Sequence, residues 1–83
     1  NGGMQNSVRV VLVTVPSREV AVNLARSLVF EGLAACVNLV PGVESIYRWQ
    51  DAIEQTEELL LVIKTGADRI AELEKRIDEL HPY

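Results

Sequence analysis

The sequence predicts an α+β domain of the ferredoxin-like, split β-α-β type, with two helices on one face of an antiparallel sheet. Three observations support this prediction: two apolar strand-like runs, an amphipathic helical segment after each of them, and a hairpin between the two units. The resulting order, β-α-β-β-α, is most of the split β-α-β pattern. Its last strand, which would lie beside the first, is absent from these 83 residues, so we expect an open hydrophobic edge.

Residues 8–15 form the first run and are nearly all apolar and rich in β-branched side chains, which is typical of a central strand covered on both faces. Pro16 ends the strand. Ser17 is expected to cap a helix over 18–31 by accepting from an unpaired backbone N–H. Gly32 suits the left-handed position beyond the helix end. The expected buried stripe of this helix contains Val20, Ala21, Leu24, Ala25 and Leu28.

A long strand is predicted over residues 34–49. Few small domains contain a strand of this length, so it indicates contacts beyond one subunit. Pro41 removes a ladder donor and Gly42 permits an unusual backbone angle, so a bulge is expected between them. Beyond the bulge the side chains alternate between two faces. Gln50 and Asp51 are the expected hairpin turn, although no glycine strengthens that prediction.

The return strand is predicted to begin near Ala52 and to become central at 59–63, where every residue is apolar. Asp68 is the expected cap of a second helix. An i,i+4 ion pair between Glu72 and Arg76 would support this helix by about 0.3 kcal/mol. Its expected buried stripe consists of Ile70, Leu73, Ile77 and Leu80.

The size of the chain favours self-association. Residues 8–83 are expected to form one domain, with 1–7 as a tag-like or disordered N-terminus. A chain of 83 residues buries only about 60–65% of its unfolded surface, so its stability alone is marginal. One cysteine excludes an internal disulfide, and nothing resembles a zinc cluster. Association with further copies is the remaining source of stability.

Charge and hydropathy exclude several classes of partner. The formal net charge of −4 argues against nucleic acid, which binding modules meet with a basic face. No apolar run approaches the roughly 20 residues of a membrane span, and no signal-peptide pattern is present. We therefore expect a cytoplasmic protein that binds neither nucleic acid nor membrane.

The segment Ala34-Ala35-Cys36-Val37-Asn38, followed by Pro41-Gly42 and Ser45-Ile46-Tyr47-Arg48-Trp49, resembles the signature of the CutA family of divalent-cation tolerance proteins. Three further pieces agree with it: Val13-Thr14-Val15-Pro16, Ile63-Lys64-Thr65 and His81-Pro82-Tyr83. The resemblance implies a ferredoxin-like subunit of a homotrimer, with long strands pairing between subunits and a link to copper and other divalent cations. Family members continue into another strand and a short helix, so the resemblance also implies a shortened C-terminus.

Cys36 and His81 are the candidate metal ligands, for copper or another divalent cation that folding does not require. The Cys36 thiolate would suit copper(I), but a lone cysteine on an apolar strand is more often a small core residue, and we favour that interpretation. His81 ends the second helix, where it can ligate a metal or interact with the negative helix pole. A copper(II) site there would need further ligands, for which Asp78, Glu79 and a neighbouring chain are the candidates.

A second candidate site combines aromatic and cationic side chains. Tyr47, Trp49 and Tyr83 would line a pocket, with Arg48 and Lys64 supplying charge for a small anionic ligand. The alternative is that Tyr47 and Trp49 pack between subunits, since aromatic residues are enriched at interfaces.

The sequence supports no catalytic function. It contains no Ser-His-Asp set, paired-carboxylate motif or phosphate loop. We therefore expect a non-enzymatic trimeric protein that binds or senses a divalent metal ion. Two alternatives stay open: a signalling trimer for a small anionic ligand, by analogy with nitrogen-regulatory PII proteins, and a purely structural assembly or docking protein.

Overall fold

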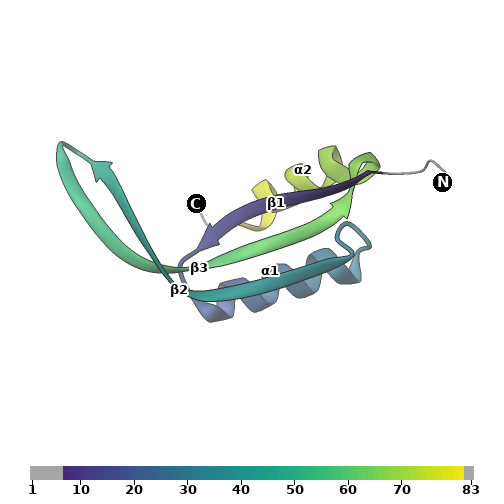
Figure 1. Ribbon diagram of the computed structural model, residues 1–83, viewed down its shortest axis with the longest axis horizontal. Coiled ribbons are helices and arrows are strands. Elements are labelled where there is room, and N and C mark those ends of the chain that lie inside the picture. Colours follow the sequence, from purple (N-terminus) through teal and green to yellow (C-terminus); the bar gives the residue numbers. More distant parts are fainter. Residues whose placement is uncertain (1–6, 82–83) are drawn as a thin grey trace.

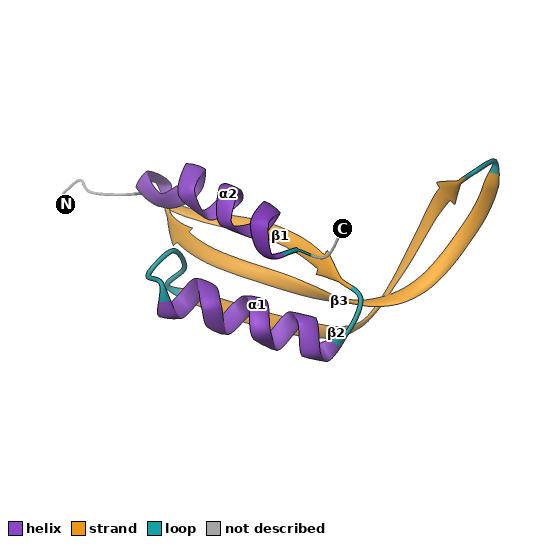
Figure 2. Cartoon of the chain, turned by 180° about the vertical axis from the view of Figure 1, so that it is seen from behind, coloured by secondary structure: helices purple, strands orange, loops and turns teal. Residues whose placement is uncertain are grey.

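The computed structural model describes residues 7–81 and contains a three-stranded antiparallel sheet in the order β1-β3-β2. The elements are β1 (Val8–Val15), α1 (Arg18–Phe30), β2 (Cys36–Trp49), β3 (Ala52–Gly66), a 3₁₀ turn (Ala67–Arg69) and α2 (Ile70–Leu80). Both helices lie on the same face of the sheet (Figures 1 and 2). This arrangement confirms the predicted α+β, ferredoxin-like fold.

The hydrophobic core lies between the helices and the face of the sheet that they cover. Alternate residues of β3, including Leu61 and Ile63, point into it and are fully buried. The helices contribute Ala21, Leu24 and Leu28 from α1 and Leu73 and Ile77 from α2. Thr65 is the one buried polar residue among those described, and its hydroxyl donates to the Leu33 carbonyl at 2.7 Å. The predicted apolar stripes therefore face the core.

Both ends of α1 follow the sequence prediction. The backbone N–H of Val20 donates to Ser17 Oγ at 3.2 Å, which satisfies one unpaired donor of the first turn. At the other end Gly32 has φ +76°. The N–H groups of Gly32 and Leu33 donate to the carbonyls of Val29 and Leu28, at 3.1 and 2.9 Å, in a Schellman motif.

A bulge interrupts β2 where it was predicted. Val40 pairs with Leu60 and Val43 pairs with Glu58, so Pro41 and Gly42 together oppose a single residue of β3. Beyond the bulge, residues 43–58 form a two-stranded hairpin, called here the arm. The arm closes at the predicted turn, where Gln50 and Asp51 have φ of 50° and 65°.

The arm projects beyond the layered body (Figure 1). The molecule measures 49 × 22 × 22 Å, and its radius of gyration is 14.5 Å. A compact chain of this length would have a radius of gyration of about 12 Å. Neither α1 nor α2 covers the arm, so its side chains have no core to pack against among the described residues (Figure 1).

Two predictions about α2 are wrong. The helix begins at Ile70 after a 3₁₀ turn, and the Asp68 side chain makes no capping hydrogen bond. Arg76 does not pair with Glu72. It binds Glu31 beyond the end of α1 through two hydrogen bonds of 2.8 and 2.9 Å, because packing brings the middle of α2 beside the end of α1.

Candidate functional site

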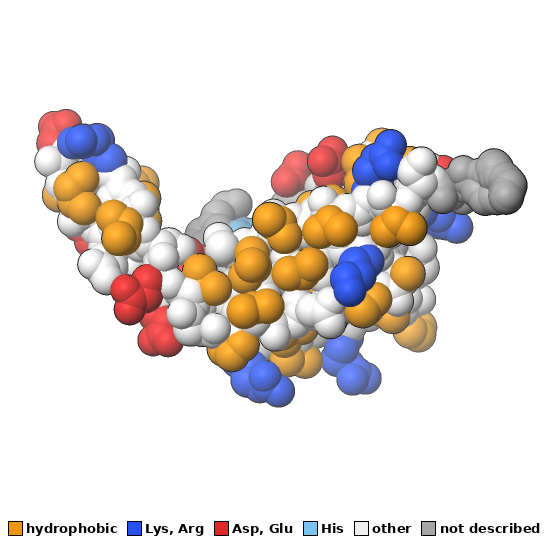
Figure 3. Space-filling model, in the orientation of Figure 1, with side chains coloured by type: hydrophobic (Ala, Val, Ile, Leu, Met, Phe, Trp, Pro, Cys, Tyr) orange, Lys and Arg blue, Asp and Glu red, His pale blue; other side chains and the backbone are white. Residues whose placement is uncertain are grey.

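The face of the sheet opposite the helices is largely apolar and has no cover within the described residues. Figure 3 shows this bare face, on which hydrophobic side chains gather. It includes Val8, Val10 and Leu12 of β1, which are between 57% and 73% exposed, and Val40 of β2. The prediction that residues 8–15 are covered on both faces is therefore wrong for this chain. β3 is central as predicted, while β1 lies at an edge.

Cys36 lies at the start of β2 on the bare face, opposite Lys64 of β3. It is exposed, and its sulfur lies 4.0 Å from the Asn38 side-chain oxygen. The interpretation of Cys36 as a core residue is therefore wrong for the single chain, because the face that carries it is uncovered.

His81 follows α2 directly and connects that helix to β1. Its Nε2 lies 3.0 Å from the backbone carbonyl oxygen of Thr14 and is placed to donate to it, while its own N–H donates to the Ile77 carbonyl at 2.7 Å. A metal would therefore bind His81 through Nδ1 or would have to displace the Thr14 hydrogen bond.

The two candidate metal ligands lie apart. His81 is hydrogen-bonded to Thr14, which pairs with Leu60 of β3. Cys36 pairs with Lys64, four residues further along β3, so the two candidate ligands are separated by about 13 Å along the strand. Within residues 7–81 no three His, Cys, Asp or Glu side chains are grouped so that they could hold a metal ion. A metal site that uses either residue needs ligands from outside this set.

Two of the three predicted aromatic residues, Tyr47 and Trp49, line a surface pocket together with carboxylates. Tyr47 lies directly opposite Glu54 in the β2–β3 ladder. This depression, called here the arm pocket, is lined by Pro16, which follows β1, and by the arm residues Tyr47, Trp49, Glu54, Thr56, Glu57 and Glu58. The acidic residues could not be predicted to lie there, because only the pairing register places Glu54 beside Tyr47.

The structure does not bring the predicted cationic residues to the arm pocket. Arg48 pairs with Ile53 and so lies on the opposite face of the arm from Tyr47. Lys64 lies eleven residues beyond Ile53 along β3, about 36 Å of strand. Tyr83 lies outside the described residues. An anionic ligand bound by Arg48 and Lys64 together would require a second copy of the chain.

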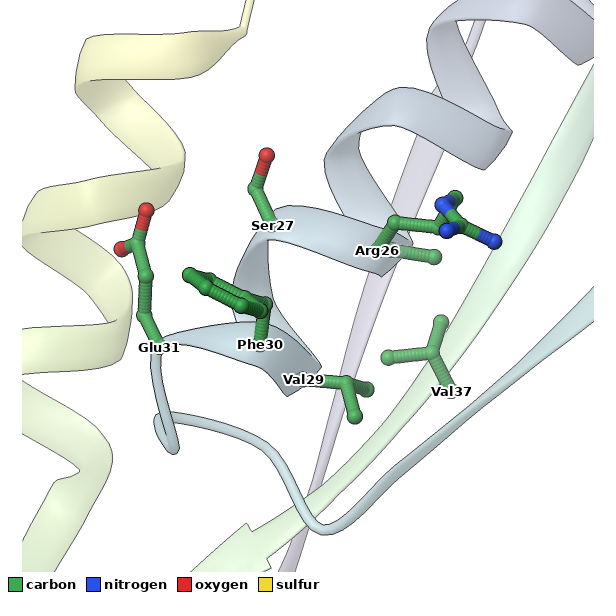
Figure 4. A pocket seen from close by; sticks show the side chains of 7 residues that line it. Arg26, Ser27, Val29, Phe30, Glu31 and Val37 are labelled. Carbon is green, nitrogen blue, oxygen red and sulfur yellow. The ribbon is translucent and has the colours of Figure 1, made fainter.

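A second, shallow pocket lies at the C-terminal end of α1. Figure 4 shows Val29 of α1 and Val37 of β2 pointing toward one another, with Phe30 on the other side of the helix end. Phe30 is 91% exposed, although it belongs to the same apolar run as the buried Leu28. The sequence contained a signal for this patch, since Val29 and Phe30 fall outside the helical stripe that packs on the sheet.

A charged contact joins the end of α1 to the middle of α2. The Arg76 guanidinium donates to both carboxylate oxygens of Glu31 and also to Glu79 at 3.2 Å. The hydrogen bonds from Arg76 lower the pKa of Glu31 below its ordinary value. Glu31 also lines the pocket at the end of α1, so this contact holds one side of that pocket in place.

None of the helices described in this chain has the length and apolar character needed to cross a membrane.

The fold and these surfaces define a ferredoxin-like α+β subunit whose bare face and arm are not covered by any of residues 7–81. A family profile described as CutA1 divalent ion tolerance protein matches residues 9–83. This chain belongs to that family, as the sequence resemblance predicted.

Individual relatives agree with this assignment. The chain is 55% identical over 74 residues to the divalent-cation tolerance protein CutA of Thermus thermophilus, covering 89% of this chain and 72% of the relative. It is 41% identical to human Protein CutA, covering 100% of this chain but 46% of the relative. It is 47% identical to the chloroplastic CutA of Arabidopsis thaliana, covering 89% of this chain and 41% of that protein. The chain thus spans less than half the length of these plant and human relatives.

Solved structures show the same fold. The Thermus thermophilus cation tolerance protein superposes with a TM-score of 0.87 at 53% identity, covering 93% of this chain and 75% of that one. CutA1 from Ehrlichia chaffeensis superposes with a TM-score of 0.92 at 28% identity, covering 96% and 75%.

Proposed function

We propose that this chain is a non-enzymatic subunit of a homotrimer that binds a divalent cation, with copper as the first candidate, and so contributes to metal-ion tolerance. The observation that carries the proposal is the bare apolar face, which continues into an arm without a core of its own. Family membership supports the link to divalent cations.

The energetics favour assembly through the bare face. Burying one Val or Leu side chain contributes about 1.5–3 kcal/mol. Association loses an estimated 4–15 kcal/mol of translational and rotational freedom, so several such side chains are needed. The bare face offers four large apolar residues that are more than two-fifths exposed, namely Val8, Val10, Leu12 and Val40. The apolar side chains of the arm add to this area.

A cation site between subunits fits the separation of the candidate ligands. His81 and Cys36 are too far apart to share an ion within one chain. Copper(II) prefers nitrogen and oxygen ligands, so His81 together with carboxylates of a neighbouring copy is the combination we favour. We assign no catalytic step to the chain, because its candidate residues form no nucleophile–base pair.

A charge placed on the bare face tests the assembly. We expect Leu12→Glu to shift the protein from trimer to monomer, since three carboxylates would enter an apolar interface. Asn23→Glu adds the same charge at an exposed position of α1 and serves as the matched control. Sedimentation equilibrium measures the mass of each. A trimer that survives Leu12→Glu would contradict this role of the bare face.

Calorimetric titration with copper(II) tests the metal site. We expect saturable heat for the assembled protein and a clear loss of affinity in His81→Ala, with circular dichroism confirming that the variant folds. Cys36→Ser is the companion variant and should retain binding if the ion is copper(II). Absence of saturable heat, or equal affinity in His81→Ala, would refute the His81 site.

We propose a cytoplasmic location. Relatives occupy other compartments by name: the Arabidopsis thaliana protein is called chloroplastic, and the Archaeoglobus fulgidus structure is called periplasmic. Cell fractionation of the full-length protein measures the location directly, and recovery in a membrane-enclosed compartment would contradict the proposal.

A further inference from the structure

We infer that the arm pocket receives an arginine side chain from a neighbouring copy of this chain, held by the Tyr47 and Trp49 rings and by the carboxylate of Glu54. The inference rests on the proposed homotrimer and adds to it the chemistry of one contact.

The Glu54 carboxylate of the pocket forms no ion pair with a Lys, Arg or His among the described residues. Glu54 pairs with Tyr47 in the ladder, so its side chain lies on the same face of the arm as the two aromatic rings. Glu57 also lines the pocket, but it pairs with Glu44 and its side chain leaves the ladder on the opposite face. A cation stacked on the rings would therefore pair with Glu54.

The aromatic side of the pocket is suited to a guanidinium. Trp49 is 61% exposed and Tyr47 is 43% exposed, and both lie on the same side of β2. A cation over an aromatic face gains about 0.5–1 kcal/mol at exposed sites and more when water is excluded. The planar guanidinium stacks on such rings while its N–H groups pair with a carboxylate in a two-point fork. Lysine offers only a point charge, so arginine fits this combination better.

The rest of the chain supplies unpaired cations but cannot reach the pocket. Of the eight Lys and Arg side chains, only Arg76 forms an ion pair with a carboxylate in the part of the chain that the structure describes. Of the other seven, Arg48 lies on the opposite face of the arm from Tyr47 and Glu54, and the remaining six belong to the body, away from which the arm projects. A second copy brings a cation to the pocket without any other partner.

The position of the pocket also favours a second copy. Along β3, Glu54, Thr56, Glu58 and Leu60 alternate onto one side of the ladder, so the arm pocket continues the bare face. A two-stranded hairpin is at best marginally stable alone. Its cover must therefore be present whenever the protein is folded, which a subunit provides and a transient partner does not.

The test compares the assembly of the wild type with that of the arm variant, Glu54→Gln. Glu72→Gln removes the same charge from an exposed position of α2 and is the matched control. The readout is the chain concentration at half-dissociation, measured by sedimentation, in urea if dilution alone is insufficient. Trp49, the only tryptophan, reports burial of the pocket by its fluorescence.

We expect the arm variant to raise the half-dissociation concentration about tenfold, a loss of about 1.4 kcal/mol, with a red shift of Trp49 emission at concentrations where the wild type stays assembled. N-acetyl-arginine amide should weaken wild-type assembly more than sodium chloride of equal ionic strength, and it should have no such excess effect on the arm variant.

A trimer that is indifferent to the Glu54 substitution, or that responds equally to arginine amide and to salt, would overturn the inference while leaving the proposed trimer intact. A protein that is monomeric at every concentration would overturn both. Substitution of each unpaired arginine by glutamine would then identify the donor in a trimer that behaves as expected, through an effect not additive with that of the arm variant.

Discussion

At the scale of single residues, His81 makes a structural hydrogen bond as well as being a candidate metal ligand. Its Nε2 bond to the Thr14 carbonyl connects the end of α2 to the end of β1. A protein hydrogen bond of this kind contributes about 0.5–1.5 kcal/mol. We expect His81→Ala to lower the free energy of unfolding by that amount, and His81→Gln, which keeps a donor, to lower it less. Urea unfolding measures both, and no loss in His81→Ala would contradict the contact.

Leu28 and Phe30 are two residues apart in α1 but should respond very differently to truncation. Leu28 is fully buried, so Leu28→Ala should cost about 2–5 kcal/mol of stability. Phe30 is almost fully exposed, so Phe30→Ser should change the stability of the subunit by no more than about 0.5 kcal/mol. Urea unfolding at one chain concentration measures both. A large loss in Phe30→Ser would show that the α1 pocket is covered in the folded protein.

At the scale of elements, the contact between Arg76 and Glu31 should make stability depend on pH. The pKa of Glu31 is lowered in the folded chain, chiefly by hydrogen bonds from Arg76. Its stabilising contribution is therefore fully present above the unfolded carboxyl pKa of about 4.3 and is lost as the pH falls through the lower folded value.

We expect Arg76→Gln to reduce this loss of stability in acid, because the pKa of Glu31 would return toward its ordinary value. Urea midpoints at neutral pH and below pH 4 measure the difference. Arg69→Gln removes a charge that pairs with no carboxylate among the described residues and is the control. Identical acid responses of wild type and Arg76→Gln would contradict the assignment.

The hairpin turn of the arm offers a stabilising change. Gln50 and Asp51 both have left-handed backbone angles, which cost most residues about 1–2 kcal/mol each. Combining Gln50→Asn with Asp51→Gly places there the residues that such turns prefer. We expect a gain in free energy of unfolding of at least about 1 kcal/mol. Asp51→Ala, which tolerates these angles less well, should have the opposite effect in the same urea measurement.

The sequence was sufficient to predict the elements but not every contact between them. The Pro41-Gly42 bulge and the Ser17 cap follow from local chemistry and were predicted. The carboxylates of the arm pocket were not, because their position depends on a pairing register that a one-residue bulge shifts. Nor was the contact from Arg76 to Glu31, which joins residues 45 positions apart.

At the scale of the whole molecule, the bare face shows that an apolar sequence pattern does not identify what covers a strand. Residues 8–15 have the composition of a strand covered on both faces, yet the described residues cover only one face of it. Such a pattern indicates that a face is buried, whether by the same chain or by a neighbouring copy. The same ambiguity explains why Cys36 was interpreted as a core residue.

The most direct test of this account is the mass of the protein in solution, measured by light scattering across a range of concentrations. The account predicts three times the 9.2 kDa of one chain, since the bare face and the arm both need cover. A mass equal to that of a single chain at every concentration would contradict the account.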